Sequence, residues 1–320
     1  MRLSGITPSG HAQLGNYLGA ISAWAAEGGD EDLYFIADLH AMTTTHNPAK
    51  LRGLAAETLA VLVAAGIPAE RVFVQSDLAR ELGALTWILE CTCSYGEAAR
   101  MIQFKEKAGG QAGVRLSLLT YPVLMAADIL LQGASEVPVG EDQSQHVELA
   151  RALARRFNGT YGEVFTVPRA VVPLAGARVR DLSDPARKMS KSTRDAAGVV
   201  FLLDEPDLIR RKIRRAVTDT HTRPEYLPED RPGVANLLEI LAACTSATPR
   251  EVAERHSTYG ALKEAVAEAV VETLRPVRER TRELLADPAE LGRVRKAGAA
   301  RAAERGEHRL SSALRLIGAG

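Results

Sequence analysis

Short apolar runs alternate with helix-like segments through the first third of the chain, and this alternation restricts the fold strongly. The apolar runs cover residues 3–6, 33–37 and 71–75, and helical periodicity follows them at about 14–24, 48–65 and 78–93. Runs of this length and composition are typical of strands that are buried on both faces. A repeated strand–helix–strand order places helices against a parallel sheet. The sequence therefore predicts an α/β protein with a doubly wound parallel sheet.

A turn and a helix start follow the first strand. Residues 7–10 read Thr-Pro-Ser-Gly, which is turn chemistry, and residues 13–16 read Gln-Leu-Gly-Asn and lead into the helix. Backbone N–H groups and a helix N-terminus at this point can hold an anion. Gly15 and Gly19 leave room for a ligand or a neighbouring strand. Because many α/β proteins begin in this way, the pattern alone does not identify the ligand.

Polar residues close the second strand, where Asp38 and His40 follow the apolar run. Polar groups at the carboxyl ends of parallel strands face the ligand crevice of an open α/β sheet. The residues alone leave two roles open for His40: a ligand-facing side chain, or a histidine satisfied in the core or at a helix cap.

The segment 116–131 has helical periodicity and places three functional side chains on one face. Tyr121, Met125 and Asp128 lie four and three residues apart, among apolar neighbours. A carboxylate buried there needs a hydrogen-bond donor, because leaving it unpaired is costly. Either an arginine or lysine of the protein, which spacing favours, or an N–H group of a ligand can supply that donor.

A second polar cluster follows the short predicted strand 136–140. Asp142 and His146 are four residues apart at the start of the next helix, which extends to Phe157, and Gln143 lies beside Asp142. Its place at another strand end, close to the helix that carries Asp128, predicts the floor of a pocket. A further strand is expected over 164–172.

Lysine is rare in the chain and gathers in two short segments. The sequence has eight lysines against 32 arginines, and four of the eight are Lys105, Lys107, Lys188 and Lys191. Residues 187–193 read Arg-Lys-Met-Ser-Lys-Ser-Thr in a predicted loop. Mobile ammonium groups beside hydroxyls suit polyphosphate. The alternative for both segments is a solvated surface.

Beyond residue 206 the strand signal ends and the pattern is helical. The segment 206–217 contains four arginines and Lys212 and predicts one helix. The formal net charge is zero, with 40 basic and 40 acidic side chains, so a nucleic acid could be held only by local basic patches of this kind.

Cysteine usage and hydropathy indicate the compartment. Three cysteines argue against a disulfide framework and fit a reducing cytosol, and Cys91 and Cys93 are expected in or near the core. The most apolar run, 59–67, is too short to cross a bilayer, and the N-terminus lacks a signal-peptide pattern. A soluble cytoplasmic protein is expected.

Taken together, these segments resemble a known family, the bacterial tryptophanyl-tRNA synthetases, which are class I enzymes. The resemblance rests on SGITPSG and QLGN within 4–16, IADLHAMT at 36–43, FKEK at 104–107, LLTYPVLMAADILL at 118–131, VPVGEDQSQHVEL at 137–149, KMSKS at 188–192, AVTD at 216–219 and ETLRP at 272–276. MAADIL and VPVGEDQ together are more specific than KMSKS alone.

The resemblance implies an architecture and an activity. It implies a Rossmann catalytic domain over 1–184, the KMSKS loop and a helical anticodon-binding domain over 185–290, and a C-terminal helix over 291–320 that packs back near the catalytic domain. The implied protein is a homodimer. It would use ATP to activate L-tryptophan to tryptophanyl-adenylate, release pyrophosphate, and transfer tryptophan to tRNA(Trp). Mg²⁺ is expected on the phosphates, without a protein metal site.

The resemblance also assigns roles to the phosphate-facing residues. QLGN corresponds to a HIGH-type signature, with Gln13 and Asn16 near the ATP phosphates and Gly15 under the nucleotide. Lys188 and Lys191 would hold the β and γ phosphates as pyrophosphate leaves, and Lys107 would join them on closure. The remaining implied ATP-binding residues are Thr7, Ser9, Gly140, Asp142 at the ribose, Val179 and Met189 at the adenine, and Ser190.

For tryptophan, the resemblance implies that Asp128 accepts the indole N–H and that Gln143 meets the amino-acid end. The other implied pocket residues are Leu3, Gly5, His40, Tyr121, Met125, Val137 and Val139. Phenylalanine has no such N–H and would leave the carboxylate unpaired; a lost hydrogen bond of this kind, in tyrosine over phenylalanine selection, is worth about 10⁵ in discrimination.

Three positions depart from the family's usual residues. Gln13 stands where the family usually has Thr or His, Thr7 where Gln is common, and Leu3 where Phe is common. Gln can donate a hydrogen bond to phosphate, so activity is compatible with the change. Leu3 and Thr7 would alter the pocket wall and the contact with ATP or tryptophan.

Two other hypotheses compete with this one. A tyrosyl-tRNA synthetase is disfavoured by Met125 and the VPVGEDQ run. A catalytically weak paralogue that only binds tRNA or nucleotide is supported by Gln13 and Thr7, but KMSKS, Lys107, Asp128 and the Asp142–Gln143 pair count against it.

Overall fold

In the part of the chain that the structure describes, five short parallel strands form the centre of the N-terminal half of the molecule. The computed structural model describes residues 1–102, 104–105, 113–140, 143–171, 178–190 and 196–319. The strands are β1 Leu3–Ile6, β2 Leu33–Ile36, β3 Val72–Val74, β4 Glu136–Pro138 and β5 Arg169–Val171. β1, β2 and β3 pair in that order, β4 pairs with β5, and an isolated parallel bridge between Arg2 and Glu136 joins the two groups. The order β3-β2-β1-β4-β5 is that of a Rossmann-type sheet, so the predicted fold class is confirmed.

Side chains of the strands alternate between two hydrophobic cores. Tyr34, Ile36, Val72 and Val74 belong to one core, which continues into the C-terminal helices. Leu33, Phe35 and Phe73 belong to the other, which lies against α4, α7 and α8. Both faces of the strands are therefore buried, which explains why the sequence shows continuous apolar runs instead of alternation.

The helices of this half begin close to the predicted positions. They are α1 Leu14–Asn16, α2 Ser22–Glu27, α3 Pro48–Ala64, α4 Ala79–Thr92, α5 Tyr95–Ala99, α7 Ser117–Gln132 and α8 Ser144–Tyr161, with short 3-10 turns at His40–Thr43, Ala69–Arg71, Gln75–Leu78 and Ala196–Gly198. The single helix predicted over 14–24 is interrupted by a π-helical segment, η1 Tyr17–Ile21. Segments of this kind are frequent at functional sites.

The second half of the chain is helical, as predicted. Its helices are α9 Pro206–Arg214, α10 Pro232–Thr245, α11 Pro249–Arg255, α12 Tyr259–Ala286 and α13 Pro288–Leu316. All except α12 begin with proline, whose fixed φ suits the first helical position and whose missing N–H is not needed there.

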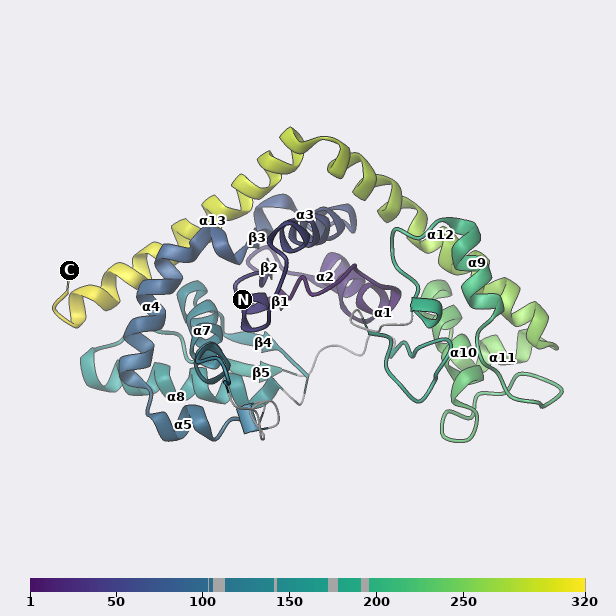
Figure 1. Ribbon diagram of the computed structural model, residues 1–320, viewed down its shortest axis with the longest axis horizontal. Helices are drawn as coiled ribbons and strands as arrows, with labels where there is room; N and C mark the ends of the chain where they lie inside the picture. Colours follow the sequence, from purple (N-terminus) through teal and green to yellow (C-terminus); the bar gives the residue numbers. More distant parts are fainter. Residues whose placement is uncertain (103, 106–112, 141–142, 172–177, 191–195, 320) are drawn as a thin grey trace.

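α12 and α13 form an arch over the rest of the molecule (Figure 1). α12 rises from the other C-terminal helices along α3, and α13 descends across β3 and α7. A Cβ atom at Gly298 of α13 would lie 1.7 Å from the carbonyl oxygen of Val72, so only glycine allows this close approach. α13 thus packs directly against β3, the edge strand of the sheet.

Several boundaries differ from the predictions for identifiable reasons. The strand expected over 164–172 is limited to β5 among the described residues, because the N–H groups of Val164 and Phe165 donate to Asn158 instead. The helix expected over 206–217 ends at Arg214, and Val217 donates its N–H to Leu182. Cys91 is exposed, so its placement in or near the core was wrong.

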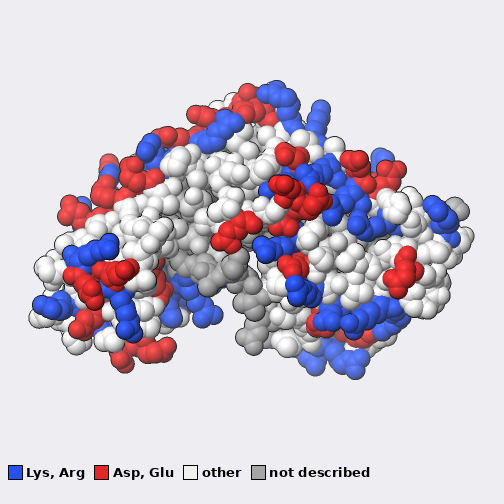
Figure 2. Space-filling view, turned by 180° about the vertical axis from the view of Figure 1, so that it is seen from behind, with Lys and Arg blue, Asp and Glu red and all other residues white. Residues whose placement is uncertain are grey.

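The basic residues of α9 are partly used within the protein. Lys212 is buried and donates to Asp204 at 2.6 Å, and Arg210 is paired with Glu268. Basic and acidic side chains intermingle over the face of the molecule that Figure 2 shows. In the described residues, no helix is both long and apolar enough to span a membrane.

Candidate active site

A cavity of about 510 Å³ opens at the carboxyl ends of β1 and β2. Its walls come from β1, β2, α7, β4 and the start of α8. It is lined by all nine residues predicted to form the tryptophan pocket, namely Leu3, Gly5, His40, Tyr121, Met125, Asp128, Val137, Val139 and Gln143. Thr7 and Gly140, predicted at the nucleotide, line the same cavity. The lining residues that the sequence did not identify are Ser4, Phe35, Ala37, Thr43, Leu118, Ile129 and Pro138.

Asp128 is a buried carboxylate in the wall of this cavity. His40 Nε2 lies 2.9 Å from Asp128 Oδ2, and Gln75 Nε2 donates to both carboxylate oxygens at 2.9 Å. The partners are therefore a histidine and an amide, and the expected arginine or lysine was wrong. Burial raises the pKa of Asp128, while the hydrogen bonds from His40 and Gln75 act in the opposite direction.

Gln75 was not identified from the sequence, although it is fully buried beneath the cavity. Its Oε1 accepts the N–H groups of Leu39 at 3.0 Å and His40 at 3.4 Å, while its amide nitrogen holds Asp128. One side chain thus joins the ends of β2 and β3 to α7. The available signal was its position directly after the strand formed by 72–74.

A second hydrogen-bonded group lies across the cavity. The hydroxyl of Tyr121 lies 3.1 Å from His146 Nε2, and His146 Nδ1 lies 2.8 Å from Gln143 Oε1. His146 is buried and its ring meets that of Tyr121 edge to face. His146 therefore supports two predicted tryptophan-binding residues. Asp142, predicted beside it, lies outside the described residues.

Gly5 forms part of the cavity wall where no larger residue fits. A Cβ atom at this position would lie 2.6 Å from the Phe35 ring, which stacks on Phe73. The missing side chain leaves the ring of Phe35 as the wall of the cavity. This steric restriction explains why a glycine occupies this position of the predicted pocket.

Gln13 caps the first helix and does not face open solvent. It is buried, its Oε1 accepts the N–H of Gly15, and its Nε2 donates to the carbonyl of Met189 at 3.0 Å. Asn16 Oδ1 accepts the N–H of Gln13 in return. Both ends of this amide therefore form hydrogen bonds within the protein, and its place near the ATP phosphates stays a prediction.

The lysine loop is described only in part. Lys188 is exposed and forms an antiparallel bridge with Arg180, and Met189 is buried, with its N–H donating to Val179 at 3.2 Å. Ser190 is half-buried. Val179 packs against Gly15, where an added Cβ would lie 3.2 Å from its side chain. Ser9 lines a neighbouring cavity together with Thr7. Lys107 and Lys191 lie outside the described residues.

The chain is similar to known proteins over most of its length. The sequence matches the class I tRNA synthetases for W and Y over residues 2–275. "Tryptophan--tRNA ligase 1" of Streptomyces coelicolor is 53% identical over 98% of this chain and 96% of its own length. "Tryptophan--tRNA ligase" of Leifsonia xyli is 47% identical, with the same two coverages.

Solved structures agree with the sequence matches. Tryptophanyl-tRNA synthetase of Mycoplasma pneumoniae superposes with a TM-score of 0.87 at 32% identity, covering 100% of this chain and 97% of that one. The Campylobacter jejuni synthetase in complex with ADP and tryptophan gives 0.85 at 32% identity, covering 99% and 100%. A tyrosyl-tRNA synthetase from Aeropyrum pernix gives 0.66 at 26% identity, covering 92% and 88%.

Proposed function

Because the chain belongs to the bacterial tryptophanyl-tRNA synthetases of class I, we propose how its own residues carry out the reaction of a tryptophan–tRNA ligase. The enzyme uses ATP to activate L-tryptophan and then transfers it to the 3′-terminal adenosine of tRNA(Trp). In the first step a carboxylate oxygen of tryptophan attacks the α-phosphorus of ATP. The bond from that phosphorus to the bridging oxygen breaks, and pyrophosphate leaves. The protein contributes alignment and charge stabilisation.

The single observation that carries the tryptophan assignment is the buried carboxylate of Asp128. Gln75 Nε2 donates to both carboxylate oxygens and His40 approaches only Oδ2, so Oδ1 keeps capacity for another donor. The indole N–H would fill it. Met125, Val137 and Val139 would enclose the ring, and Gln143 would meet the amino-acid end. Leu3, Gly5, His40 and Tyr121 complete the proposed pocket.

The nucleotide would lie between the first helix and the lysine loop. Lys188, Lys191 and Lys107 would neutralise the leaving pyrophosphate, and such contacts accelerate the reaction when they strengthen in the transition state. Gln13 would act on this site through Met189, as a positioning residue. The other proposed ATP contacts are Thr7, Ser9, Gly15, Asn16, Gly140, Asp142, Val179, Met189 and Ser190.

Further parts of the proposal concern ions, domains and compartment. Mg²⁺ would bind the ATP phosphates, because it usually binds through substrate phosphates and few protein ligands. Residues 1–184 would form the catalytic domain, 185–290 the KMSKS loop and anticodon-binding domain, and 291–320 the returning helix. The protein would act in the cytoplasm.

A second copy of the chain would cover the exposed apolar residues beside the tryptophan cavity. Trp87 is 68% exposed and Met42 is 52% exposed, and both line a shallow cavity that Tyr121 and Leu124 of α7 also line. Leu116, at the start of α7, is 72% exposed. Exposed apolar surface of this kind is typical of protein interfaces. The dimer is tested by comparing the sedimentation of Trp87→Glu with that of the unmodified protein. The substitution should dissociate the dimer, because it places a charged group in the proposed interface.

The proposed activity is tested by ATP–pyrophosphate exchange with each of the twenty amino acids and Mg²⁺. Exchange that depends on tryptophan alone is expected. Exchange with tyrosine would show that the substrate is tyrosine, as in the tyrosyl-tRNA synthetases. No exchange, with tRNA still bound, would favour a binding protein whose site is disabled by Leu3, Thr7 and Gln13.

A further inference from the structure

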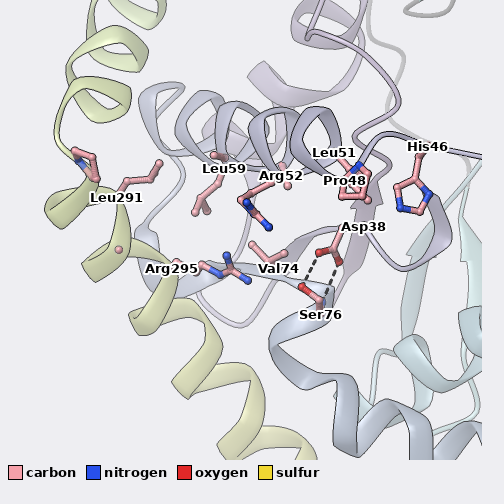
Figure 3. A pocket seen from close by; sticks show the side chains of 14 residues that line it. Asp38, His46, Pro48, Leu51, Arg52, Leu59, Val74, Ser76, Leu291 and Arg295 are labelled. Atoms are coloured by element: carbon pink, nitrogen blue, oxygen red, sulfur yellow. Dashed lines mark hydrogen bonds between the residues drawn. The ribbon is translucent and has the colours of Figure 1, made fainter. Parts of the chain in front are cut away.

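A second cavity, of about 420 Å³, lies behind the tryptophan cavity on the other face of the sheet. Figure 3 shows that its walls come from α3, the ends of β2 and β3, and the start of α13. It is lined by Asp38, His46, Pro48, Leu51, Arg52, Ala55, Ala56, Leu59, Val74, Ser76, Pro288, Leu291, Gly292 and Arg295. None of these side chains is assigned a part in tryptophan activation.

The cavity offers positive charge that the protein does not fully use. Arg52 is exposed and makes no hydrogen bond or ion pair with the residues that the structure describes. Arg295 holds Asp77 through Nε and Nη2, which leaves its Nη1 without a partner among those residues. Both guanidinium groups point into the space between α3 and α13 (Figure 3), and His46 stands at its rim.

The acidic groups nearby are already engaged. Asp38 accepts the N–H of Ser76 at 3.0 Å and its hydroxyl at 2.6 Å. Asp77 is held by the Arg295 guanidinium, which raises the pKa of Arg295. A cationic ligand would therefore meet two arginines and only engaged carboxylates. An anionic ligand would meet an unpaired guanidinium that can form charge-assisted hydrogen bonds.

The floor of the cavity is apolar. Leu51, Leu59, Val74 and Leu291 line it, with Ala55 between them. A nucleic-acid phosphate would pair with the arginines but leave these side chains uncovered. A small molecule that carries both an anionic group and an aliphatic chain would use both features, and the volume lies within the usual range for ligand pockets.

We propose that this cavity binds a small organic anion, a carboxylate or phosphate monoester with a short aliphatic chain, through Arg52 and Arg295. Its wall is continuous with the tryptophan site. Asp38 and Ser76 lie in the wall, while Gln75, next to Ser76, holds Asp128 and the N–H of His40. Occupancy therefore changes tryptophan affinity, and this coupling, unlike the binding itself, rests on the proposed function.

The binding is tested by calorimetric titration of the whole protein with hexanoate, with hexylamine and inorganic phosphate as comparisons, in the absence and presence of tryptophan. Hexanoate should bind, hexylamine should not, and phosphate should bind more weakly because it has no chain. Arg52→Gln should weaken hexanoate about tenfold, since it removes a charge-assisted hydrogen bond. Arg155→Gln is the matched control, because Arg155 is also an exposed helical arginine but lies outside the cavity; it should change nothing.

Several results would overturn the proposal. If hexanoate affinity is unchanged in Arg52→Gln, or if hexylamine binds equally well, the cavity does not select anions through Arg52. If phosphate binds as strongly as hexanoate, the aliphatic chain contributes nothing to binding. Displacement of hexanoate by tRNA would identify the occupant as a nucleic acid.

The coupling has its own measurement. Saturating hexanoate should change the tryptophan dissociation constant by the same factor by which tryptophan changes that of hexanoate. Unchanged tryptophan affinity would refute the coupling. If hexanoate binds through Arg52 but the protein shows no exchange activity, the proposed function fails while the cavity assignment stands.

Discussion

Gln13 donates its side-chain N–H to the carbonyl oxygen of Met189, 176 positions away in the sequence and 3.0 Å away in space. The same side chain accepts the N–H of Gly15 in the first helix. Both Gln13 and Met189 are buried. One amide thus joins the segment 13–16 to the lysine loop.

Gln13→Met should weaken this tie while keeping the length of the side chain. Loss of one buried hydrogen bond, worth about 1 kcal/mol, should raise the KM for ATP about fivefold. Tryptophan affinity should stay the same, because Gln13 does not line the tryptophan cavity. Exchange kinetics and tryptophan titration measure both. A fall in kcat at unchanged KM would support direct contact with the phosphates instead.

The contact between Gln13 and Met189 joins distant parts of the chain, so local sequence patterns do not predict it. The faces of helices and the ends of strands follow from local periodicity, so the amino-acid sequence alone places Tyr121, Met125 and Asp128 on one face of α7. The partners of those side chains depend on how distant elements pack. Gln75 meets Asp128 across 53 positions, and no local pattern marks either partner for the other. For the same reason, the sequence predicted an arginine or lysine partner for Asp128, whereas its partners in the structure are His40 and Gln75.

Gln75→Met should leave Asp128 without its amide donor and the backbone N–H groups of Leu39 and His40 without an acceptor. Unsatisfied buried groups cost about 1–3 kcal/mol each, so both stability and tryptophan affinity should fall. Gln132→Met is the matched control, because Gln132 is equally buried and donates to Ala302 of α13, away from the cavity. It should lower stability alone. Equal tryptophan affinity in the two variants would show that Gln75 only supports the fold.

Asp128→Asn keeps the shape of the side chain but removes the carboxylate that would accept the indole N–H. The amide oxygen of Asn can still accept the indole N–H, but a neutral hydrogen bond is worth about 0.5–1.5 kcal/mol and one to a charged group about 1.5–3 kcal/mol, so the tryptophan dissociation constant should rise about fivefold to tenfold. The KM for ATP should change little. Equilibrium titration with tryptophan measures the effect, and unchanged affinity would refute the indole assignment.

Lys191→Ala should slow activation with little loss of tryptophan binding. This prediction rests on the sequence of the loop, because Lys191 lies outside the described residues. Removing one group that stabilises transition-state charge costs about 10²–10³ in rate. Single-turnover formation of the adenylate measures the step. Lys296→Ala, which removes an exposed lysine on α13, is the control and should be as fast as the unmodified protein. An unchanged rate in Lys191→Ala would show that Lys191 does not stabilise the transition state.

Glu97 provides a test of stability against pH, away from the active site. The Arg156 guanidinium, and then the Ser94 cap of α5, hold the pKa of Glu97 at about 2 instead of 4.5. A depressed folded-state pKa contributes stability above the unfolded-state value, and this stability is lost as the pH falls from 4.5 towards about 2.

Glu97→Gln should therefore lower the free energy of unfolding by about 1 kcal/mol at pH 6, after allowance for solvent screening of a partly exposed pair. The difference from the unmodified protein should narrow as the pH falls and should largely disappear near pH 2. Urea unfolding at several pH values measures it. Glu254→Gln, at an exposed glutamate without an ion pair among the described residues, is the control and should show little difference at any pH. If the difference for Glu97→Gln stays constant with pH, the packing of the Glu97 side chain, and not its ionised carboxylate, stabilises α5.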